Sequence, residues 1–178
     1  MNLFTPRMDF KSPITVISIF SIIGGVAYMI YSPITQYGMS LDPTIIENRA
    51  LQFLLYSFLH WGMLHILSNV IFFLFIGKII EITHGKSYTW LLWIWTTLFV
   101  GTVLMFLSTH STIWWSGFAM ALLTIYTLDF YKRGNPEYKW WLLLIMLNIG
   151  IGLYGNVSLL WHLAGAIAGF LYGIVIKK

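Results

Sequence analysis

The chain has 178 residues, of which 58% are hydrophobic, 18% aromatic and only 9% charged, and its formal net charge is +4. A soluble domain typically carries about 25% charged residues, so this composition excludes an ordinary soluble protein and predicts helices that are apolar on almost every face. The absence of cysteine excludes thiol chemistry. Because the sequence shows no glycine-rich phosphate loop, no basic nucleic-acid patch and no internal repeat, we expect a single membrane domain over residues 1–178 and no nucleic-acid partner.

Apolar stretches of about the length needed to cross a bilayer recur along the chain. A hydrocarbon core about 30 Å thick requires roughly 20 apolar helical residues. The first stretch follows Arg7 and Lys11 as in a signal peptide, but it is too long for a signal core and no small-residue cleavage site follows, so we predict a retained helix. The sequence therefore predicts an all-α polytopic membrane protein, a bundle of six transmembrane helices. In chain order the predicted spans are about 14–31, 61–80, 88–107, 114–130, 139–155 and 157–176.

Lysine and arginine gather on one side of this predicted bundle. With six spans, the N-terminus, two of the loops and the C-terminus share a side, and that side carries every basic residue except Arg49. Because cytoplasmic loops hold the excess of lysine and arginine, we expect both termini in the cytoplasm. The small size and this charge bias favour a bacterial inner (cell) membrane, with the lipid bilayer as the surroundings of the chain.

Polar side chains within the predicted spans lie at a similar depth on the opposite side. His65 lies about 4 residues into the second span and His162 about 5 residues into the sixth, or roughly 6 and 8 Å at 1.5 Å per residue. Ser116 opens the fourth span, and Asn69 follows His65 by four residues, so it shares the same helix face. Because polar groups inside a membrane are costly and often functional, we expect a site here that opens to the outer side.

These residue types suit nucleophilic catalysis, although each has a purely structural alternative. A nucleophilic serine needs a nearby base, and His162 is the histidine placed deep in a span with no other evident role. His65, Asn69 and a backbone N–H at the head of the fourth helix are candidate donors to an oxyanion, and Gly117 would let a substrate backbone approach. Alternatively, Ser116 is a packing or back-bonding residue, and the second-span pair makes interhelical hydrogen bonds.

Spacing disfavours a metal site and predicts close helix packing. His60 and His65 are five residues apart, about 140° around a helix, and the zinc motif HExxH is absent. His60 is expected to cap or anchor the second helix, and His84 is expected to be a solvated loop residue. The sixth span carries glycines at every fourth position, which predicts a close approach to another helix. If that neighbour is the fourth helix, the candidate serine and histidine come within reach. The glycines are Gly165, Gly169 and Gly173.

Several motifs, in order along the chain, resemble those of one membrane protein family. "HWGMLHILSN" (60–69) is similar to an H-x4-H-x3-N pattern, "SG" (116–117) to the end of GxSG, and "HLAGAIAG" (162–169) to H-x-A-G-x-x-x-G. "GKIIEITHGK" (77–86) is similar to the cytoplasmic turn of the same family. Over about residues 50–176 the chain thus resembles a rhomboid intramembrane serine protease.

The resemblance implies a role for each matching residue. Ser116 would be the nucleophile and His162 the general base and acid, a dyad without an aspartate. His65 and Asn69 would help to form the oxyanion hole, and His60 would be a structural histidine near the cavity. The fold would be the six-helix rhomboid bundle with a water-filled cavity open to the outside. No metal or organic cofactor is implied, and the substrate would be another transmembrane protein, cut in or just outside its membrane helix.

Some positions depart from the family pattern and keep a second function open. Trp114 replaces the first glycine of GxSG, and Met120 stands where many members have a tyrosine packed on the catalytic histidine. Leu51 and Gln52 occupy the positions of a common Trp-Arg pair. These changes fit a divergent, rhombosortase-like branch, or a catalytically inactive rhomboid-like protein that binds or escorts membrane helices. A transporter is disfavoured, because the carboxylates map to loops or span ends.

Overall fold

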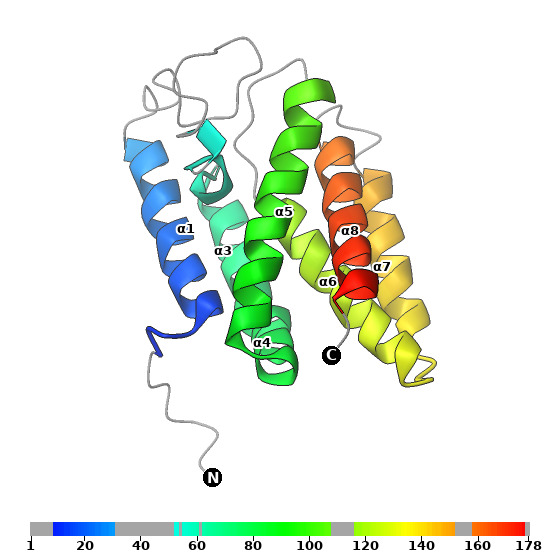
Figure 1. The fold of residues 1–178 in the computed structure, drawn as a ribbon. Helices are drawn as coiled ribbons and strands as arrows, with labels where there is room; N and C mark the ends of the chain where they lie inside the picture. The colour runs from blue at the N-terminus through cyan, green and yellow to red at the C-terminus, as the bar shows by residue number, and fades with distance from the viewer. Residues whose placement is uncertain are drawn as a thin grey trace.

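A computed structural model describes residues 9–30, 52–53, 55–60, 62–107, 116–151 and 158–176. These residues are almost entirely helical, and no β-strand occurs among them. Figure 1 shows the helices packed side by side in one bundle, with α1 beginning and α8 ending toward the same end. The elements are α1 (Pro13–Ile30), η2 (Tyr56–Phe58), α3 (Met63–Phe72), η3 (Phe73–Gly77), α4 (Lys78–His84), α5 (Lys86–Leu107), α6 (Ser116–Lys132), α7 (Tyr138–Ile151) and α8 (Ser158–Val175).

The second predicted span is longer than expected. α3, the π-helical segment η3 and α4 form one continuous helix, Met63–His84, which runs four residues past the predicted end at residue 80. Gly85 then adopts φ +95°, a conformation that glycine reaches at little cost, and α5 begins at the next residue. The sequence suggested that His84 is a solvated loop residue, and this prediction is wrong. His84 ends α4, and its Nε2 lies 2.6 Å from Oδ2 of Asp129 on α6.

Helix length and burial divide the bundle into outer helices and a central one. Three described helices are long and apolar enough to cross a membrane, namely Pro13–Ile30, Met63–His84 and Lys86–Leu107. α7 and the segment Leu159–Val175 of α8 are apolar but shorter. α6 has 17 residues, or about 25 Å of helix, and most of its residues from Ser116 to Thr127 are buried. Neighbouring helices rather than lipid surround α6, so it need not match the bilayer thickness.

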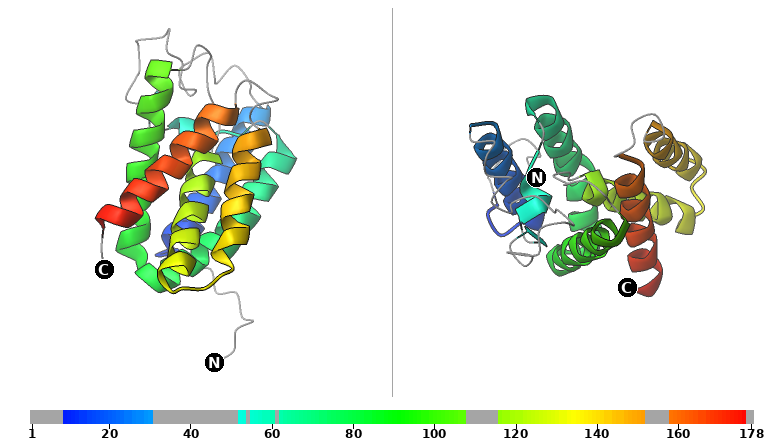
Figure 2. Two further views of the ribbon diagram at one scale, coloured as in Figure 1. Left: turned by 90° about the vertical axis from the view of Figure 1, so that its right-hand side faces the viewer. Right: turned by 90° about the horizontal axis from the view of Figure 1, so that it is seen from above.

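The head of α6 lies within the bundle rather than at its surface. In Figure 1, and in the view turned by 90° in Figure 2, α6 begins below the upper ends of α5, α7 and α8. The predicted fourth span starts at residue 114, but positions 114–115 lie outside the described residues, as do positions 152–155 of the fifth span. The first residue of α6 is therefore recessed from that end of the bundle.

α6 and α8 touch backbone to backbone. A Cβ atom built on Gly165 would lie 2.7 Å from Cα of Gly117, and one on Gly169 would lie 2.7 Å from Cα of Ala121. Real Cβ atoms essentially never come this close to another heavy atom. The glycine face of the sixth predicted span therefore packs on the fourth, which is the arrangement that would bring the candidate serine and histidine together.

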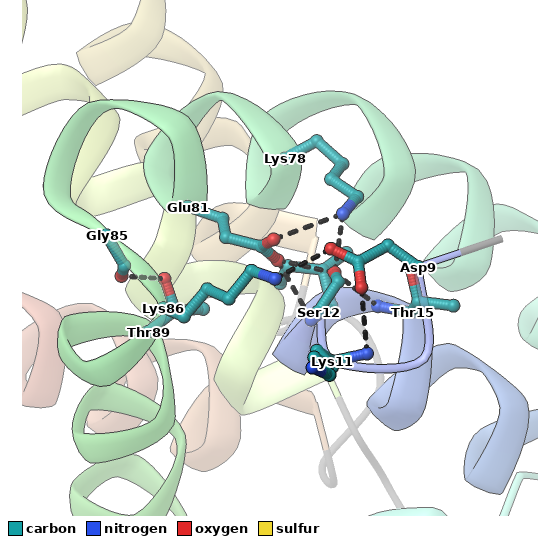
Figure 3. Close-up of polar contacts among 10 residues, drawn as sticks. Asp9, Lys11, Ser12, Thr15, Lys78, Glu81, Gly85, Lys86 and Thr89 are labelled. Atoms are coloured by element: carbon teal, nitrogen blue, oxygen red, sulfur yellow. Dashed lines mark hydrogen bonds and ion pairs between the residues drawn. The ribbon is translucent and has the colours of Figure 1, made fainter. Parts of the chain in front are cut away.

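A glutamate from α4 supports the start of α1 at the other end of the bundle. Oε2 of Glu81 accepts hydrogen bonds from Oγ of Ser12, at 2.7 Å, and from the backbone N–H of Ile14, at 3.2 Å (Figure 3). Lys78 donates to Oε1 of the same carboxylate at 3.2 Å and also to Ser12. Because the first backbone N–H groups of a helix have no partner within it, the buried Glu81 links α4 to α1.

The first prediction concerns the glycine contact. Gly165→Ala places a methyl group against the backbone of α6, and we expect it to lower the free energy of unfolding by about 1–3 kcal/mol through overpacking. Thermal unfolding in detergent, followed by circular dichroism, measures the change. Gly150→Ala on α7 is the matched control, since a Cβ there meets nothing within 4 Å. Equal melting temperatures for the two variants would contradict the packing argument.

The second prediction concerns the polar link between α4 and α1. Glu81→Ala leaves Ser12, Lys78 and the N–H of Ile14 without this acceptor, so we expect a loss of about 1–3 kcal/mol. The same thermal assay measures it. Glu137→Ala, at an exposed position, serves as the control and should leave the melting temperature nearly unchanged. A similar melting temperature for both variants would remove Glu81 from the set of stabilising residues.

Candidate active site at the head of α6

The hydroxyl of Ser116 is buried and unpaired. Ser116 is the first residue of α6 and is only 9% exposed. Among the described residues its Oγ has no hydrogen-bond partner. A buried polar atom without a partner costs about 1–3 kcal/mol, and strained or unsatisfied groups persist mainly where function requires them. This hydroxyl is therefore the first feature of the structure that points to a reactive group.

Contact between α8 and α6 brings the turn that carries His162 to the turn that carries Ser116. A Cβ atom built on Gly117 would lie 3.7 Å from the carbonyl oxygen of Trp161, and one built on Gly165 would meet the backbone of Gly117. The two candidate residues are thus adjacent in sequence to a direct interhelical contact. Their side chains are not hydrogen-bonded to each other, since Oγ of Ser116 has no partner among the described residues, and such contacts often form only when substrate binds.

The imidazole of His162 is oriented by α7. Its Nδ1 lies 2.7 Å from the backbone carbonyl oxygen of Asn148. Because a carbonyl only accepts, Nδ1 must carry the proton, and Nε2 of the neutral ring then keeps its lone pair. This is the tautomer that a general base requires. Sequence analysis missed Asn148; a polar residue inside the apolar fifth span was the available signal, although its contribution comes from the main chain.

His60, which precedes α3, and His65, on α3, continue the site away from α8. His65 is close enough to His162 for the two imidazoles to interact electrostatically. The rings of His60 and His65 have their centroids 5.2 Å apart. His60 is fully buried and donates from Nδ1 to the carbonyl oxygen of Phe58 at 3.2 Å. The three histidines singled out from the sequence therefore lie in succession from the start of α3 to α8.

Asn69 and Gly117 are both buried, and the amide of Asn69 is partly engaged within its own helix. Its Nδ2 donates to the carbonyl oxygen of His65 at 3.0 Å, within its own helix. One of its two amide N–H groups is thus engaged locally, and the other is the donor available for a substrate. At Gly117 a Cβ would meet both Cγ atoms of Val100 at 3.3 Å, so a larger residue would press on α5 beside the serine.

Met120 lies beneath the candidate residues Ser116 and His162. It lies one turn after Ser116 on the same face of α6 and is 3% exposed. Its apolar cluster includes Ile145 of α7 and Ala166 of α8, which lies one turn after His162. The thioether therefore fills the space between three helices beneath the candidate residues. Trp114, Leu51 and Arg49 lie outside the described residues, whereas Gln52 is fully buried.

A match to the Rhomboid domain family covers residues 47–178, which is well over half of the chain. The chain belongs to the rhomboid family. This rhomboid is 26% identical over 150 residues to RHOMBOID-like protein 4 of Arabidopsis thaliana, a match that covers 80% of the chain and 38% of that relative. It thus spans well under half the length of the relative. Family membership and the apolar helices make it a multi-pass integral membrane protein and confirm the predicted all-α rhomboid bundle.

No cluster of metal-binding side chains accompanies this site in the part of the rhomboid that the structure describes. Groups of three or more His, Cys, Asp or Glu residues able to hold an ion do not occur there. The chemistry that the arrangement itself supports is proton transfer and nucleophilic attack by a serine next to an oriented imidazole.

The unpaired hydroxyl yields a stability prediction that is independent of activity. Ser116→Ala removes a buried polar atom that has no partner among the described residues, so we expect the free energy of unfolding to rise by about 1 kcal/mol. Ser21→Ala is the comparison, because Oγ of Ser21 is buried and donates to the carbonyl oxygen of Ile17 at 2.7 Å. Thermal unfolding should rank Ser116→Ala above the parent chain and Ser21→Ala no higher than it. A destabilised Ser116→Ala variant would instead assign the serine a structural bond.

Proposed function

We propose that this rhomboid is an intramembrane serine endopeptidase that cleaves transmembrane segments of other membrane proteins. Ser116 is the nucleophile and His162 its general base. The observation that carries the proposal is the buried, unpaired hydroxyl at the head of α6, one backbone contact away from a histidine whose Nδ1 is bonded to a carbonyl. Buried Ser21 bonds a carbonyl of its own helix, whereas buried Ser18 has no partner among the described residues. The position of Ser116 beside the turn of His162 therefore sets it apart, together with its unpaired hydroxyl.

The proposed reaction follows from these positions. Nε2 of His162 takes the proton from Oγ of Ser116 as the oxygen attacks the scissile carbonyl, and the imidazolium then donates that proton to the leaving amine. The carbonyl of Asn148 holds the ring through Nδ1, in the place that an aspartate takes in a triad. Water then attacks the acyl-enzyme ester with His162 again acting as base.

The oxyanion would form at the first residues of α6. The first N–H groups of α6 have no partner within the helix and lie at the positive end of its dipole. His65 and the remaining amide N–H of Asn69 supply further donors from α3, while Gly117 leaves room for the substrate backbone. Because the head of α6 is recessed (Figure 1), reaction would occur below the end of the bundle, where water is scarce and charge is stabilised by the protein.

The charge distribution supports an orientation for this reaction. Lys78, Lys86 and Lys132 belong to the helix ends opposite the head of α6. With the excess of basic residues facing the cytoplasm, both termini would be cytoplasmic and the site would open to the outer side of a bacterial inner membrane. The substrate would then enter from the bilayer and be cut near the outer end of its helix.

A catalytically inactive rhomboid that binds or escorts membrane helices is the second candidate. It is favoured by Met120, which packs beneath the candidate residues as a flexible apolar side chain and does not hold His162 as rigidly as an aromatic ring. In this case helix binding would survive Ser116→Ala and would depend on the apolar faces of the bundle.

Labelling with a fluorophosphonate probe in detergent separates the two candidates. We expect wild type to form a covalent adduct on Ser116, and both Ser116→Ala and His162→Ala to reduce labelling by at least about 100-fold, the scale of losing a nucleophile or its base. Ser21→Ala, a buried serine whose hydroxyl is already bonded, is the matched control and should label like wild type.

The melting temperature of each variant shows whether a loss of labelling reflects chemistry or unfolding. Absence of any adduct on the folded protein, both as wild type and as the Trp114→Gly variant that restores the glycine of the family motif, would overturn the protease proposal. Labelling that persists in folded His162→Ala would remove His162 as the base. Loss of labelling in variants whose melting temperatures are no lower than that of wild type assigns the reaction to these two side chains.

A further inference from the structure

A cavity and a groove adjoin each other at the end of the bundle opposite the candidate active site. The cavity, about 360 Å³, lies among α4, α5, α6 and α8, and its polar lining comes from His84, Asp129 and Lys132. The groove, about 550 Å³, lies between α5 and α8 and is lined almost entirely by apolar side chains. Ile176 lines both, so the two form one continuous surface that is polar at the helix ends and apolar toward the middle of the bundle.

The groove has fixed walls. Nε1 of Trp95 on α5 donates to the carbonyl oxygen of Ala168 on α8 at 2.9 Å. About one turn further along α8, the hydroxyl of Tyr172 donates to the carbonyl oxygen of Tyr88 on α5 at 3.0 Å. These bonds hold α5 and α8 at a set separation. The cavity and the groove together line α5 from Tyr88 to Leu98, a rise of about 15 Å, which is about the hydrocarbon depth of one leaflet.

The cavity presents one negative and one positive group side by side. Asp129 and Lys132 are three residues apart and share a face of α6. Asp129 is paired with His84 at 2.6 Å, with each side chain 15% exposed, and Lys132 donates to the carbonyl oxygen of Gly173 at 2.8 Å. A carboxylate accepts several hydrogen bonds and an ammonium donates three, so both groups retain capacity for a ligand.

We propose that this surface binds one aminophospholipid, phosphatidylethanolamine, from the leaflet on the side where α8 ends. Its phosphate lies against Lys132, its ammonium against Asp129, and one acyl chain follows the groove between α5 and α8. The headgroup carries both charges that the cavity can match. A purely anionic headgroup would leave Asp129 facing negative charge, and a quaternary choline has no N–H to donate to a carboxylate.

The proposal stands apart from the candidate protease site. Neither Ser116, His162 nor any other residue assigned to that site lines the cavity or the groove. Lipid binding can therefore be tested on the full chain whether or not the serine is reactive.

Native mass spectrometry of the full-length protein in mild detergent tests the headgroup assignment. Palmitoyl-oleoyl lipids with ethanolamine, glycerol or choline headgroups are titrated separately, and we expect phosphatidylethanolamine to bind about fivefold more tightly than the other two. Lys132→Gln and Asp129→Asn should each weaken that lipid by about fivefold. Arg133→Gln is the matched control, because Arg133 is the next cation along the chain and does not line the cavity.

A photoreactive phosphatidylethanolamine with a diazirine in its acyl chain tests the groove. In liposomes, adducts should concentrate at least threefold on peptides that carry residues 91–98 and 171–176, relative to the exposed face of α1 around Phe20 and Ile23. Equal binding of the three headgroups, or adducts spread evenly over both faces, would overturn the proposal and indicate bulk lipid only. Should Asp129→Asn fail to fold, Lys132→Gln and the headgroup comparison on the unaltered chain still decide the outcome.

Discussion

The direct backbone contact between α6 and α8 is the constraint on which the remaining features depend. Lipid tails are as apolar as leucine, so no hydrophobic force drives helices together inside a bilayer, and close packing and hydrogen bonds take that role. The absent Cβ atoms of Gly165 and Gly169 allow the closest approach in the bundle. Side chains also donate to backbone carbonyl oxygens of α8, from Trp95 to Ala168 and from Lys132 to Gly173. A short, central α6 and an α8 fixed against it follow from this one contact.

Buried polar groups in the bundle differ in how far their hydrogen bonds are satisfied. At the end where α1 begins, Glu81 is surrounded by donors and its carboxylate links two helices (Figure 3). At the other end, Ser116 is buried with no partner among the described residues. Stability that a bonded group contributes at one end allows an unsatisfied group to persist at the other. Ser18 and Thr96 are also buried without a partner among the described residues, so the place of Ser116 beside the turn of His162 is what distinguishes the candidate site.

Hydropathy and spacing could predict the helical class and the residues that share a face, because both follow from the helix period and the thickness of a bilayer. His65 with Asn69, and the glycines of α8, are examples. The path of Met63–His84 past residue 80 was not predictable in this way, since a charged residue near a span end is compatible with either loop or helix. The pairing of His84 with Asp129 required the tertiary structure, because 45 residues separate the two. The carbonyl of Asn148 had no side-chain signature at all.

The bond from His162 to that carbonyl has a consequence for how the imidazole is controlled. An acceptor on a side chain is lost when the residue changes, whereas a main-chain oxygen is present whatever residue occupies position 148. Substitution therefore cannot easily remove it, but displacement can: any shift of α7 away from α8 lengthens the 2.7 Å contact and releases the ring. The orientation and tautomer of the imidazole thus depend on the position of a helix rather than on the identity of a neighbouring residue, so that movement of α7 would reposition the ring.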